Sequence, residues 1–291
     1  MKKITLLALI MTFVSASNLF SQASKFMQPD PTIGIDAIIK SSNPYTNFGN
    51  VDELVMNSSN TGTIRSLIKF ADINTIPANA QIESAVLYLY GYGTSTITPN
   101  GNSWPNNGLS NELWIERITQ PWSESTVQWS NQPTTTTLNR VNVTPSTSVL
   151  NWNYSDNSNN LLQMVKYMHA NPSQNNGFMI KLQNETSPRN TFFKSSDFSE
   201  EKFRPTLIVF YSTADFSYTY LASNIYAYTF SSQYFCSSQW SHEWTIDGVV
   251  VSTNMNFNYT FPYSSTYTIC HKITHIYDGR EFTKCETICI E

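Results

Sequence analysis

The sequence is poor in charged residues and carries no excess of basic ones. Charged residues make up 13% of the 291 residues, with 17 Lys and Arg against 21 Asp and Glu. Proteins that bind DNA or RNA neutralise phosphates with clustered Lys and Arg, so this balance disfavours nucleic acid as a partner. Glycine (10) and proline (13) are too few for a collagen-like or low-complexity chain. With 40% hydrophobic and 14% aromatic residues, the chain can bury a large core.

Long hydrophobic runs are also missing, except for one at the start. Residues 4–14 are apolar and follow the basic start Met1-Lys2-Lys3, which suits a secretory signal peptide. The run is too short for a membrane span, which needs ~20 residues. We therefore expect residues 1–23 to be a signal peptide and the mature chain to be secreted, extracellular or at the cell surface, with no membrane span. An uncleaved membrane anchor is the alternative.

Cysteine is absent until late in the chain, where Cys236, Cys270, Cys285 and Cys289 follow one another. An even number of cysteines in an exported chain suggests disulfides, and four cysteines allow three pairings. We expect a bond between Cys270 and Cys285, across a hairpin that turns near residues 277–279. Zinc binding is the alternative, which the spacing of Cys285 and Cys289 does not favour.

Helical periodicity is scarce, and short β-rich runs recur between turns of Asn, Ser, Gly and Pro. One short helix is expected at residues 161–168, capped by Asn159 or Asn160 and ended by Asn171-Pro172. Because strands and helices do not alternate, a parallel α/β sheet is excluded. Examples of such runs, which we expect to be strands, are residues 33–40, 65–70, 84–90, 113–118, 178–182, 191–194 and 206–211.

A division of the chain is expected near residues 213–215. A β-rich run ends at Tyr211, and the cysteines begin only after it. The strands expected beyond the division are residues 218–220, 226–230, 243–246, 257–261, 266–276 and 282–290. The expected fold class is therefore all-β, and the part from residue 213 to 291 suits a small immunoglobulin-like β-sandwich.

Several segments of the first part resemble a known family in their order and spacing. The most specific of them is WSESTVQWSNQP at residues 122–133. The others are DAII (36–39), NPYTNFG (43–49), RSLIKF (65–70), IESAVLYLY (82–90), NGFMIK (176–181), FKSSD (193–197) and RPTL (204–207). Together they resemble the DNRLRE domain, also classed as carbohydrate-binding module family 96, over about residues 30–212.

This resemblance implies a jelly-roll-like β-sandwich, which we place at residues 24–212. It also implies a secreted module of the kind that accompanies polysaccharide-active enzymes, and some members bind acidic polysaccharides such as alginate. The chain departs from the family pattern in a long loop at 94–110 and in an insertion between Val143 and the expected helix, so the ligand is not carried over.

A second resemblance covers about residues 216–291. The segments WTIDG (244–248), YTF (259–261) and STYTIC (265–270) are similar to PKD-like modules of secreted bacterial proteins. The resemblance implies an immunoglobulin-fold module that serves as a spacer or an adhesion unit.

Aromatic residues in polar loops are candidates for binding a sugar. A flat ring can cover the CH groups of a pyranose, while polar neighbours bond its hydroxyls. Trp104 and Trp152 lie in two long polar stretches, with Tyr154 near the second, so we expect them to form binding platforms. Trp122 and Trp129 belong to the family motif and are expected to pack in the core.

An acidic polysaccharide also needs Arg or Lys against its carboxylates, with Arg favoured for its bidentate fork. Arg65 and Lys69 share one face of an expected strand, while Arg117 and Lys194 lie in two other strands. These four residues are candidates for lining a basic groove. The alternative, which the net charge of −4 favours, is that Arg65 is a packed structural residue and the others are solvated charges.

No catalytic pattern is recognisable in the sequence. A glycosidase needs two carboxylates that flank the sugar bond, and the acidic residues here are scattered. Glu124 lies in the motif at 122–133, where we expect it to fix a turn by accepting backbone N–H groups. His271 and His275 are four apart in an expected strand, which places them too far from each other to share one metal ion.

The sequence therefore predicts a secreted, non-catalytic protein whose partner is a polysaccharide. No cofactor is expected, although structural calcium near Asp36, Asn47 and Asp52 stays open because small β-sandwiches often hold it. The main alternative is a structural or adhesive cell-surface protein that has a protein partner and no glycan ligand. A polysaccharide lyase or hydrolase is the least favoured alternative.

Overall fold

The computed structural model describes most of the chain from residue 23 onward. The residues outside this description are 1–22, 94, 96, 98–100, 106–108, 187, 222–225, 234–239, 277, 278, 280 and 291. The signal peptide expected at residues 1–23, all but its last residue, and Cys236 therefore lie outside the described residues. Among the helices that are described, none is long and apolar enough to cross a bilayer.

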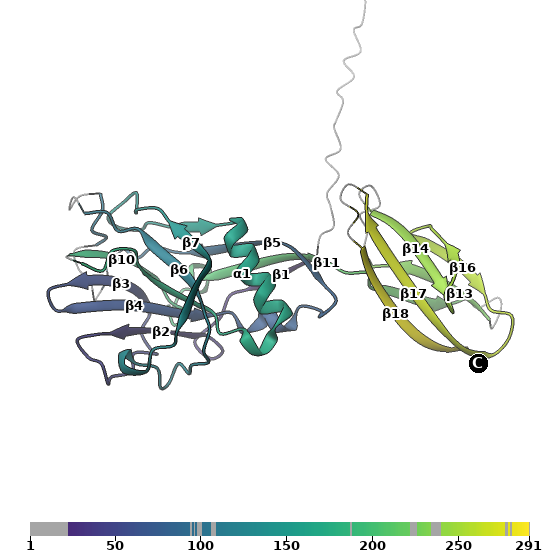
Figure 1. Cartoon of the computed structure of the whole chain (residues 1–291), viewed down its shortest axis with the longest axis horizontal. Coiled ribbons are helices and arrows are strands. Elements are labelled where there is room, and N and C mark those ends of the chain that lie inside the picture. Colours follow the sequence, from purple (N-terminus) through teal and green to yellow (C-terminus); the bar gives the residue numbers. More distant parts are fainter. Residues whose placement is uncertain are drawn as a thin grey trace, which may run out of the picture.

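Two antiparallel sheets build the described chain between residues 23 and 212 (Figure 1). The smaller sheet has the strand order β1-β11-β5-β8, and the larger has the order β10-β3-β4-β9-β6-β7 with β2 paired to β4. Their strands are β1 (Ala23–Met27), β2 (Ile35–Lys40), β3 (Glu53–Ser59), β4 (Gly62–Lys69), β5 (Gln81–Leu89), β6 (Leu113–Ile118), β7 (Thr135–Val143), β8 (Tyr154–Asp156), β9 (Phe178–Leu182), β10 (Arg189–Lys194) and β11 (Thr206–Ser212).

The main core lies between these two sheets. Alternate residues of each strand point inward, as Leu87 and Leu89 of β5 and Ile115 of β6 do. The helix α1 (Asn159–Ala170) adds the apolar face of Leu161, Met164, Val165 and Met168 to the same core. Short 3-10 helices stand at Ala71–Thr75, Trp129–Asn131, Pro172–Gln174 and Glu201–Phe203. The expected β-sandwich is confirmed.

The N-cap of the helix lies one residue before the first of its two expected caps, Asn159. The hydroxyl of Ser158 accepts a hydrogen bond from the Leu161 N–H, so Ser158 is the N-cap rather than Asn159 or Asn160. Asn171 ends the helix, as expected, because its N–H still bonds the Tyr167 carbonyl while its backbone leaves the helical conformation.

A second pair of antiparallel sheets follows residue 215. One sheet has the order β12-β13-β16 and the other the order β15-β14-β17-β18. The strands are β12 (Phe216–Tyr220), β13 (Ala227–Ser232), β14 (Trp240–Ile246), β15 (Val249–Ser252), β16 (Asn256–Thr260), β17 (Ser265–His275) and β18 (Glu281–Ile290). Their own core surrounds Trp244, which is fully buried against Phe216, Phe230 and Phe257. Three strands facing four is the immunoglobulin-like arrangement that the sequence predicts.

The expected disulfide is present in this second pair of sheets. Cys270 of β17 and Cys285 of β18 lie directly opposite each other in the register and are bonded. A zinc site built on Cys285 is thereby excluded. Cys289 is exposed and forms no disulfide within the described part of the chain.

A buried histidine joins the second core to the segment between the two pairs of sheets. His271 stacks on Trp244 at 4.0 Å between ring centroids, and its Nδ1 lies 2.8 Å from the carbonyl oxygen of Ala214. Its Nε2 lies 3.0 Å from Nδ1 of His242. Burial lowers the pKa of His271 to about 4, so the ring is neutral at physiological pH.

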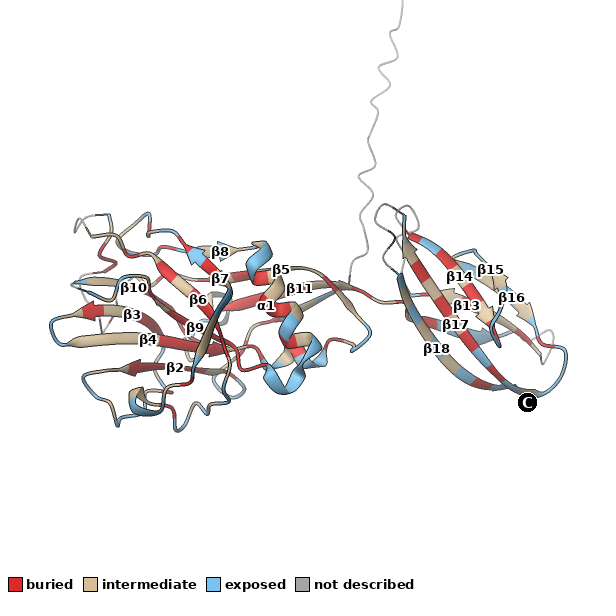
Figure 2. Cartoon of the chain, in the orientation of Figure 1, coloured by how far each residue is buried: buried red, intermediate tan, exposed pale blue. Residues whose placement is uncertain are grey.

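The buried residues of both pairs of sheets can be followed in Figure 2. They run along β14 and β17 of the second pair and along β3, β4 and β6 of the first.

Candidate functional site

The outer face of the larger sheet carries polar and aromatic side chains in a row. In β6, Leu113 and Ile115 point into the core, so Trp114 and Glu116 point outward. Trp114 lies opposite Lys181 of β9 on one side and Asn142 of β7 on the other. These residues belong to a groove of about 290 Å³, which we call the outer groove. It is lined by Arg65, Trp114, Glu116, Thr137, Arg140, Lys181, Leu182, Gln183 and Glu185.

One buried carboxylate organises the centre of the outer groove. The Glu116 side chain is 2% exposed, and its Oε2 lies 2.7 Å from the Lys181 Nζ. The same oxygen accepts a hydrogen bond of 2.6 Å from the Thr135 hydroxyl, and the Arg140 guanidinium lies 3.8 Å from the other oxygen. Because a buried charge needs a close partner, Glu116 holds Lys181 in place more firmly than it holds Arg140.

Arg140 has the most freedom of the cations in the groove to meet a ligand. Its guanidinium stacks over the Trp114 ring at 3.6 Å, and its side chain is 38% exposed. A stacked guanidinium keeps its in-plane N–H groups available for a carboxylate. Arg140 therefore presents a bidentate donor beside the partly exposed Trp114 ring, whose face under the guanidinium is covered. Neither was a candidate from the sequence, although the position of Trp114 between two core residues in β6 marks it as an outward-facing ring.

Arg65 lines the same groove, but protein side chains already accept the hydrogen bonds of its guanidinium. Its Nε and Nη2 donate to the two carboxylate oxygens of Glu185, each at 2.7 Å. Its Nη1 donates to Gln132 Oε1 at 2.7 Å, and the guanidinium lies over the Trp129 ring at 4.9 Å. These contacts fit the alternative weighed for Arg65, a packed and hydrogen-bonded residue.

The prediction that Arg65, Lys69, Arg117 and Lys194 line one basic groove is wrong. Of these four residues, only Arg65 lines the outer groove. Arg117 follows Glu116 directly and therefore points to the opposite face of β6, where it is 7% exposed and lies over the Tyr167 ring of α1 at 3.7 Å. Lys194 is 8% exposed and lies over the Phe203 ring at 3.8 Å. It belongs to β10, and β3 lies between that strand and β4. Burial also lowers the Lys194 pKa.

Lys69 shares the strand face of Arg65, but an apolar cluster stands between the two. Leu67 is buried there in a cluster against which Trp122 and Trp129 pack, as was expected for both tryptophans. Lys69 is half-buried at the other end of the strand, next to Gly177.

Of the three aromatic residues predicted to form binding platforms, Trp152 is buried, so the prediction for this residue is wrong. Trp152 is 7% exposed and packs in the main core, with its ring 5.5 Å from that of Phe193. Tyr154 packs partly against the same core, and its hydroxyl donates to Asp156 Oδ1 at 3.1 Å. Trp104 is half-buried in its loop, where its carbonyl accepts a hydrogen bond from the Ser146 hydroxyl. The core reaches under the second polar stretch because β8 lies within it and pairs with β5.

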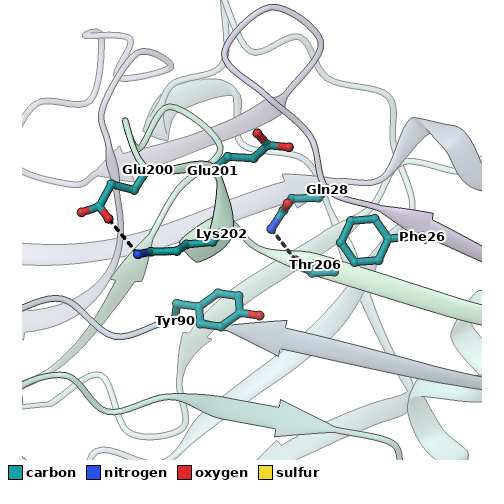
Figure 3. A pocket seen from close by; sticks show the side chains of 7 residues that line it. All are labelled: Phe26, Gln28, Tyr90, Glu200, Glu201, Lys202 and Thr206. Carbon is teal, nitrogen blue, oxygen red and sulfur yellow. Dashed lines mark hydrogen bonds and ion pairs between the residues drawn. The ribbon is translucent and has the colours of Figure 1, made fainter.

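A second hollow lies on the outer side of the smaller sheet. It has a volume of about 720 Å³ and is lined by Phe26, Gln28, Tyr90, Glu200, Glu201, Lys202 and Thr206 (Figure 3). Phe26 is 59% exposed, and Gln28 Nε2 donates to the Thr206 hydroxyl at 2.8 Å. The lining has two carboxylates, Glu200 and Glu201, and one ammonium group, Lys202, which pairs with Glu200 at 3.5 Å. This charge balance disfavours a ligand with carboxylates.

The residues weighed for calcium do not form one site together. The Asn47 side-chain amide donates to the carbonyls of Glu124 and Val127, and Asp52 Oδ2 accepts a bond from the Tyr92 hydroxyl. Asp36 is buried, and its backbone N–H donates to Glu124 Oε1 at 2.9 Å, so Glu124 lies between Asp36 and the Asn47 amide. Glu124 thus accepts a backbone N–H, as expected, but from β2 rather than from its own turn.

Comparison with known proteins gives one informative match. No curated protein matches the chain. Among solved structures, a chain of the tripod from the baseplate of bacteriophage Tuc2009 aligns over 92% of this chain and 97% of its own. Its identity of 9% and TM-score of 0.17 are too low to bear on fold or function. The sequence model of one family matches residues 30–211, more than half of the chain, and the protein therefore belongs to carbohydrate-binding module family 96.

Proposed function

We propose that the protein is a secreted, non-catalytic polysaccharide-binding protein whose outer groove binds an acidic polysaccharide such as alginate. The observation that carries this proposal is the stacking of Arg140 on Trp114, at 3.6 Å and beside Lys181. A uronate residue offers a carboxylate to a guanidinium and an apolar ring face to an aromatic side chain. The groove offers the guanidinium and, beside it, the part of the Trp114 ring that Arg140 leaves uncovered. Its lining holds the cations Arg65, Arg140 and Lys181 against the carboxylates Glu116 and Glu185.

The charges in the groove support a binding role rather than a catalytic one. Glu116 is bonded to Lys181 and Thr135, and Glu185 is bonded to Arg65. A carboxylate that acts as general acid or base must be free to reach the sugar bond. Both carboxylates of the groove are instead tied to cations by ion pairs.

Two alternatives stay open beside the proposal. The hollow around Phe26 and Tyr90 supports a neutral glycan as ligand, because its exposed ring stands beside carboxylates that accept hydrogen bonds from hydroxyls. A structural or adhesive cell-surface protein with a protein partner is the alternative in which neither place binds a sugar.

We also propose that the chain is organised as a binding domain at residues 24–212 and an accessory domain at 213–291. The separate cores around Leu87 and around Trp244 support this division. The accessory domain would act as a PKD-like spacer or adhesion unit. Its disulfide supports export, since disulfides persist in oxidising compartments.

Affinity electrophoresis of the full chain through gels that contain alginate, pectin, xylan, cellulose, agar or chitin tests the proposal. We expect retardation by an acidic polymer, and Arg140→Ala should abolish most of it. Lys202→Ala is the matched control, because Lys202 is 71% exposed and belongs to the other hollow. If a neutral polymer retards the chain and Phe26→Ala abolishes this retardation, the binding site is the hollow around Phe26 and not the outer groove. If no polymer retards the chain, the proposal is wrong and the structural alternative is favoured.

A further inference from the structure

Three carboxylates from distant parts of the chain meet beside the end of the larger sheet. Asp36 lies in β2, Glu124 lies between β6 and β7, and Asp197 follows β10. One oxygen of each lies within 4.8 Å of the corresponding oxygens of the other two. Oxygens that bind one Ca²⁺ ion at about 2.3–2.6 Å lie up to about 5 Å from each other, so this spacing fits one ion.

Two carboxylates of the cluster have buried oxygen atoms without partners. Asp36 is 0% exposed, and while its Oδ2 accepts a bond of 2.8 Å from the Ser196 N–H, its Oδ1 has no hydrogen-bond partner among the described residues. Asp197 Oδ2 is also buried and has no partner in the same part of the chain, and the buried Ser196 hydroxyl lies beside Asp36. A buried polar atom that bonds nothing destabilises the fold, so these oxygens indicate that a ligand belongs between them.

None of the three carboxylates of the cluster forms an ion pair with a Lys or Arg that the structure describes. Burial and the charge of Asp52 raise the pKa of Asp197 and outweigh the charge of Arg204, which lowers it. Burial, followed by the negative charges of Asp197 and Glu124, raises the pKa of Asp36 to about 7. Burial likewise raises the pKa values of Glu124 and Asp197. Each carboxylate therefore resists ionisation beside the other two, and a divalent ion would remove that repulsion.

We propose that Asp36, Glu124 and Asp197 bind one calcium ion, with the Ser196 hydroxyl as a further ligand. Every ligand is an oxygen, which selects a hard cation over zinc or copper. Calcium accepts irregular sets of six to eight oxygens, whereas magnesium demands a near-octahedral set at shorter distances. Waters would complete the coordination at Glu124 and Asp197, which are only partly buried.

The backbone around the cluster is shaped to bring these side chains together. A Cβ atom on Gly49 would stand 2.5 Å from the Glu124 carbonyl oxygen, so only glycine allows this approach. The Asn47 amide bonds the same carbonyl and that of Val127, which fixes the segment that carries Glu124. The ion would thus connect β2, this segment and the loop after β10.

The same segment reaches the outer groove. Its Trp129 and Gln132, which follow Glu124 by five and eight residues, contact the Arg65 guanidinium. Loss of calcium is therefore expected to loosen one wall of the groove. Calcium binding itself does not depend on the groove being a sugar site.

Isothermal titration calorimetry of the full chain, stripped with EDTA, tests the proposal directly with CaCl₂ as the titrant. We expect one calcium ion per chain and a rise of ~5 °C or more in the melting temperature at 1 mM CaCl₂. Asp197→Asn should weaken binding by at least ~10-fold, since it removes a direct ligand at a partly exposed position that tolerates substitution. Asp72→Asn is the matched control, because the Asp72 side chain is 49% exposed and its ion-pair partner among the described residues is Lys25, outside the cluster.

Asp36→Asn separates a metal site from a merely protonated buried acid. In EDTA it should melt no lower than the parent chain, because it removes a repelled charge, but calcium should no longer raise its melting temperature. The proposal is overturned if 5 mM CaCl₂ gives neither heat nor a thermal shift. It is equally overturned if calcium binds Asp197→Asn and Glu124→Gln as tightly as the parent chain. Since no polysaccharide is present, failure here is distinct from failure of the sugar-binding proposal.

Discussion

Replacing Lys181 with Met isolates the charge at the centre of the outer groove. The Lys181 ammonium lies 2.7 Å from Glu116 Oε2, and the Glu116 side chain is 2% exposed. The substitution keeps most of the side-chain volume but leaves a buried carboxylate without its closest cation. Arg140 stays at 3.8 Å and the Thr135 hydroxyl at 2.6 Å, so the carboxylate keeps part of its compensation.

The magnitude follows from these distances. Breaking a buried ion pair by removing one partner costs about 3–5 kcal/mol. Lys181 is 23% exposed and Arg140 remains, so we expect a loss near the lower limit, about 2–3 kcal/mol in the free energy of unfolding. For a domain of this size the melting temperature should fall by ~5–10 °C.

Urea unfolding of four chains measures this interaction as a double-mutant cycle. The chains are the parent, Lys181→Met, Glu116→Gln and the double variant. The double variant should be more stable than Lys181→Met alone, because it no longer buries an uncompensated charge. If Lys181→Met unfolds at the same urea concentration as the parent, or if the two changes add without coupling, the assigned role of Glu116 is wrong.

Three further predictions concern stability. Acid should destabilise the second pair of sheets. The folded pKa of His271 is about 4 against 6.5 when unfolded, so the stabilisation is complete above pH 6.5 and falls by about 3 kcal/mol as the pH drops to 4. Urea unfolding at pH 7 and pH 4.5 measures most of this loss. In His271→Gln the free energy of unfolding should depend less on pH. Reduction of Cys270–Cys285, which closes a separation of 15 residues, should cost about 3 kcal/mol in the same part of the chain, while Cys289→Ser should change little. Trp152→Ala should cost about 3–5 kcal/mol by leaving a cavity in the main core, and Trp104→Ala clearly less, when both are compared by thermal unfolding.

The sequence predicts strands best where apolar residues alternate or cluster. The bounds of β6 and β9 agree with the expected ranges 113–118 and 178–182. In contrast, β3 and β7 are not among the expected strands. β7 reads TTTLNRVNV, so its outward face is polar and its inward face contributes only Val141 and Val143 to the core. A local pattern of this kind does not distinguish a strand from a polar loop.

The candidate site was harder to predict because its residues come from different strands. Within one strand, alternation already implies that Glu116 and Arg117 face opposite sides. That rule does not say that Arg65 of β4, Lys181 of β9 and Trp114 of β6 lie in one groove, since the order of strands in the sheet is not visible in a single sequence. For the same reason the sequence does not predict that Asp36 and Asp197, which are 161 residues apart, lie within one cluster.

The pairing of β1 with β11 has a consequence for how the chain folds. Ala23 lies opposite Tyr211 and Met27 opposite Leu207, so the strand that comes first must wait for the strand that comes last in this pair of sheets. Contacts between such distant residues close very long loops, and domains dominated by them fold in milliseconds to seconds rather than microseconds. Until β11 arrives, β1 presents unpaired N–H and C=O groups and the exposed ring of Phe26. The edge of β1 is therefore open to pairing with other chains until β11 has formed, and early formation of the β1–β11 pair would protect the folding chain from aggregation.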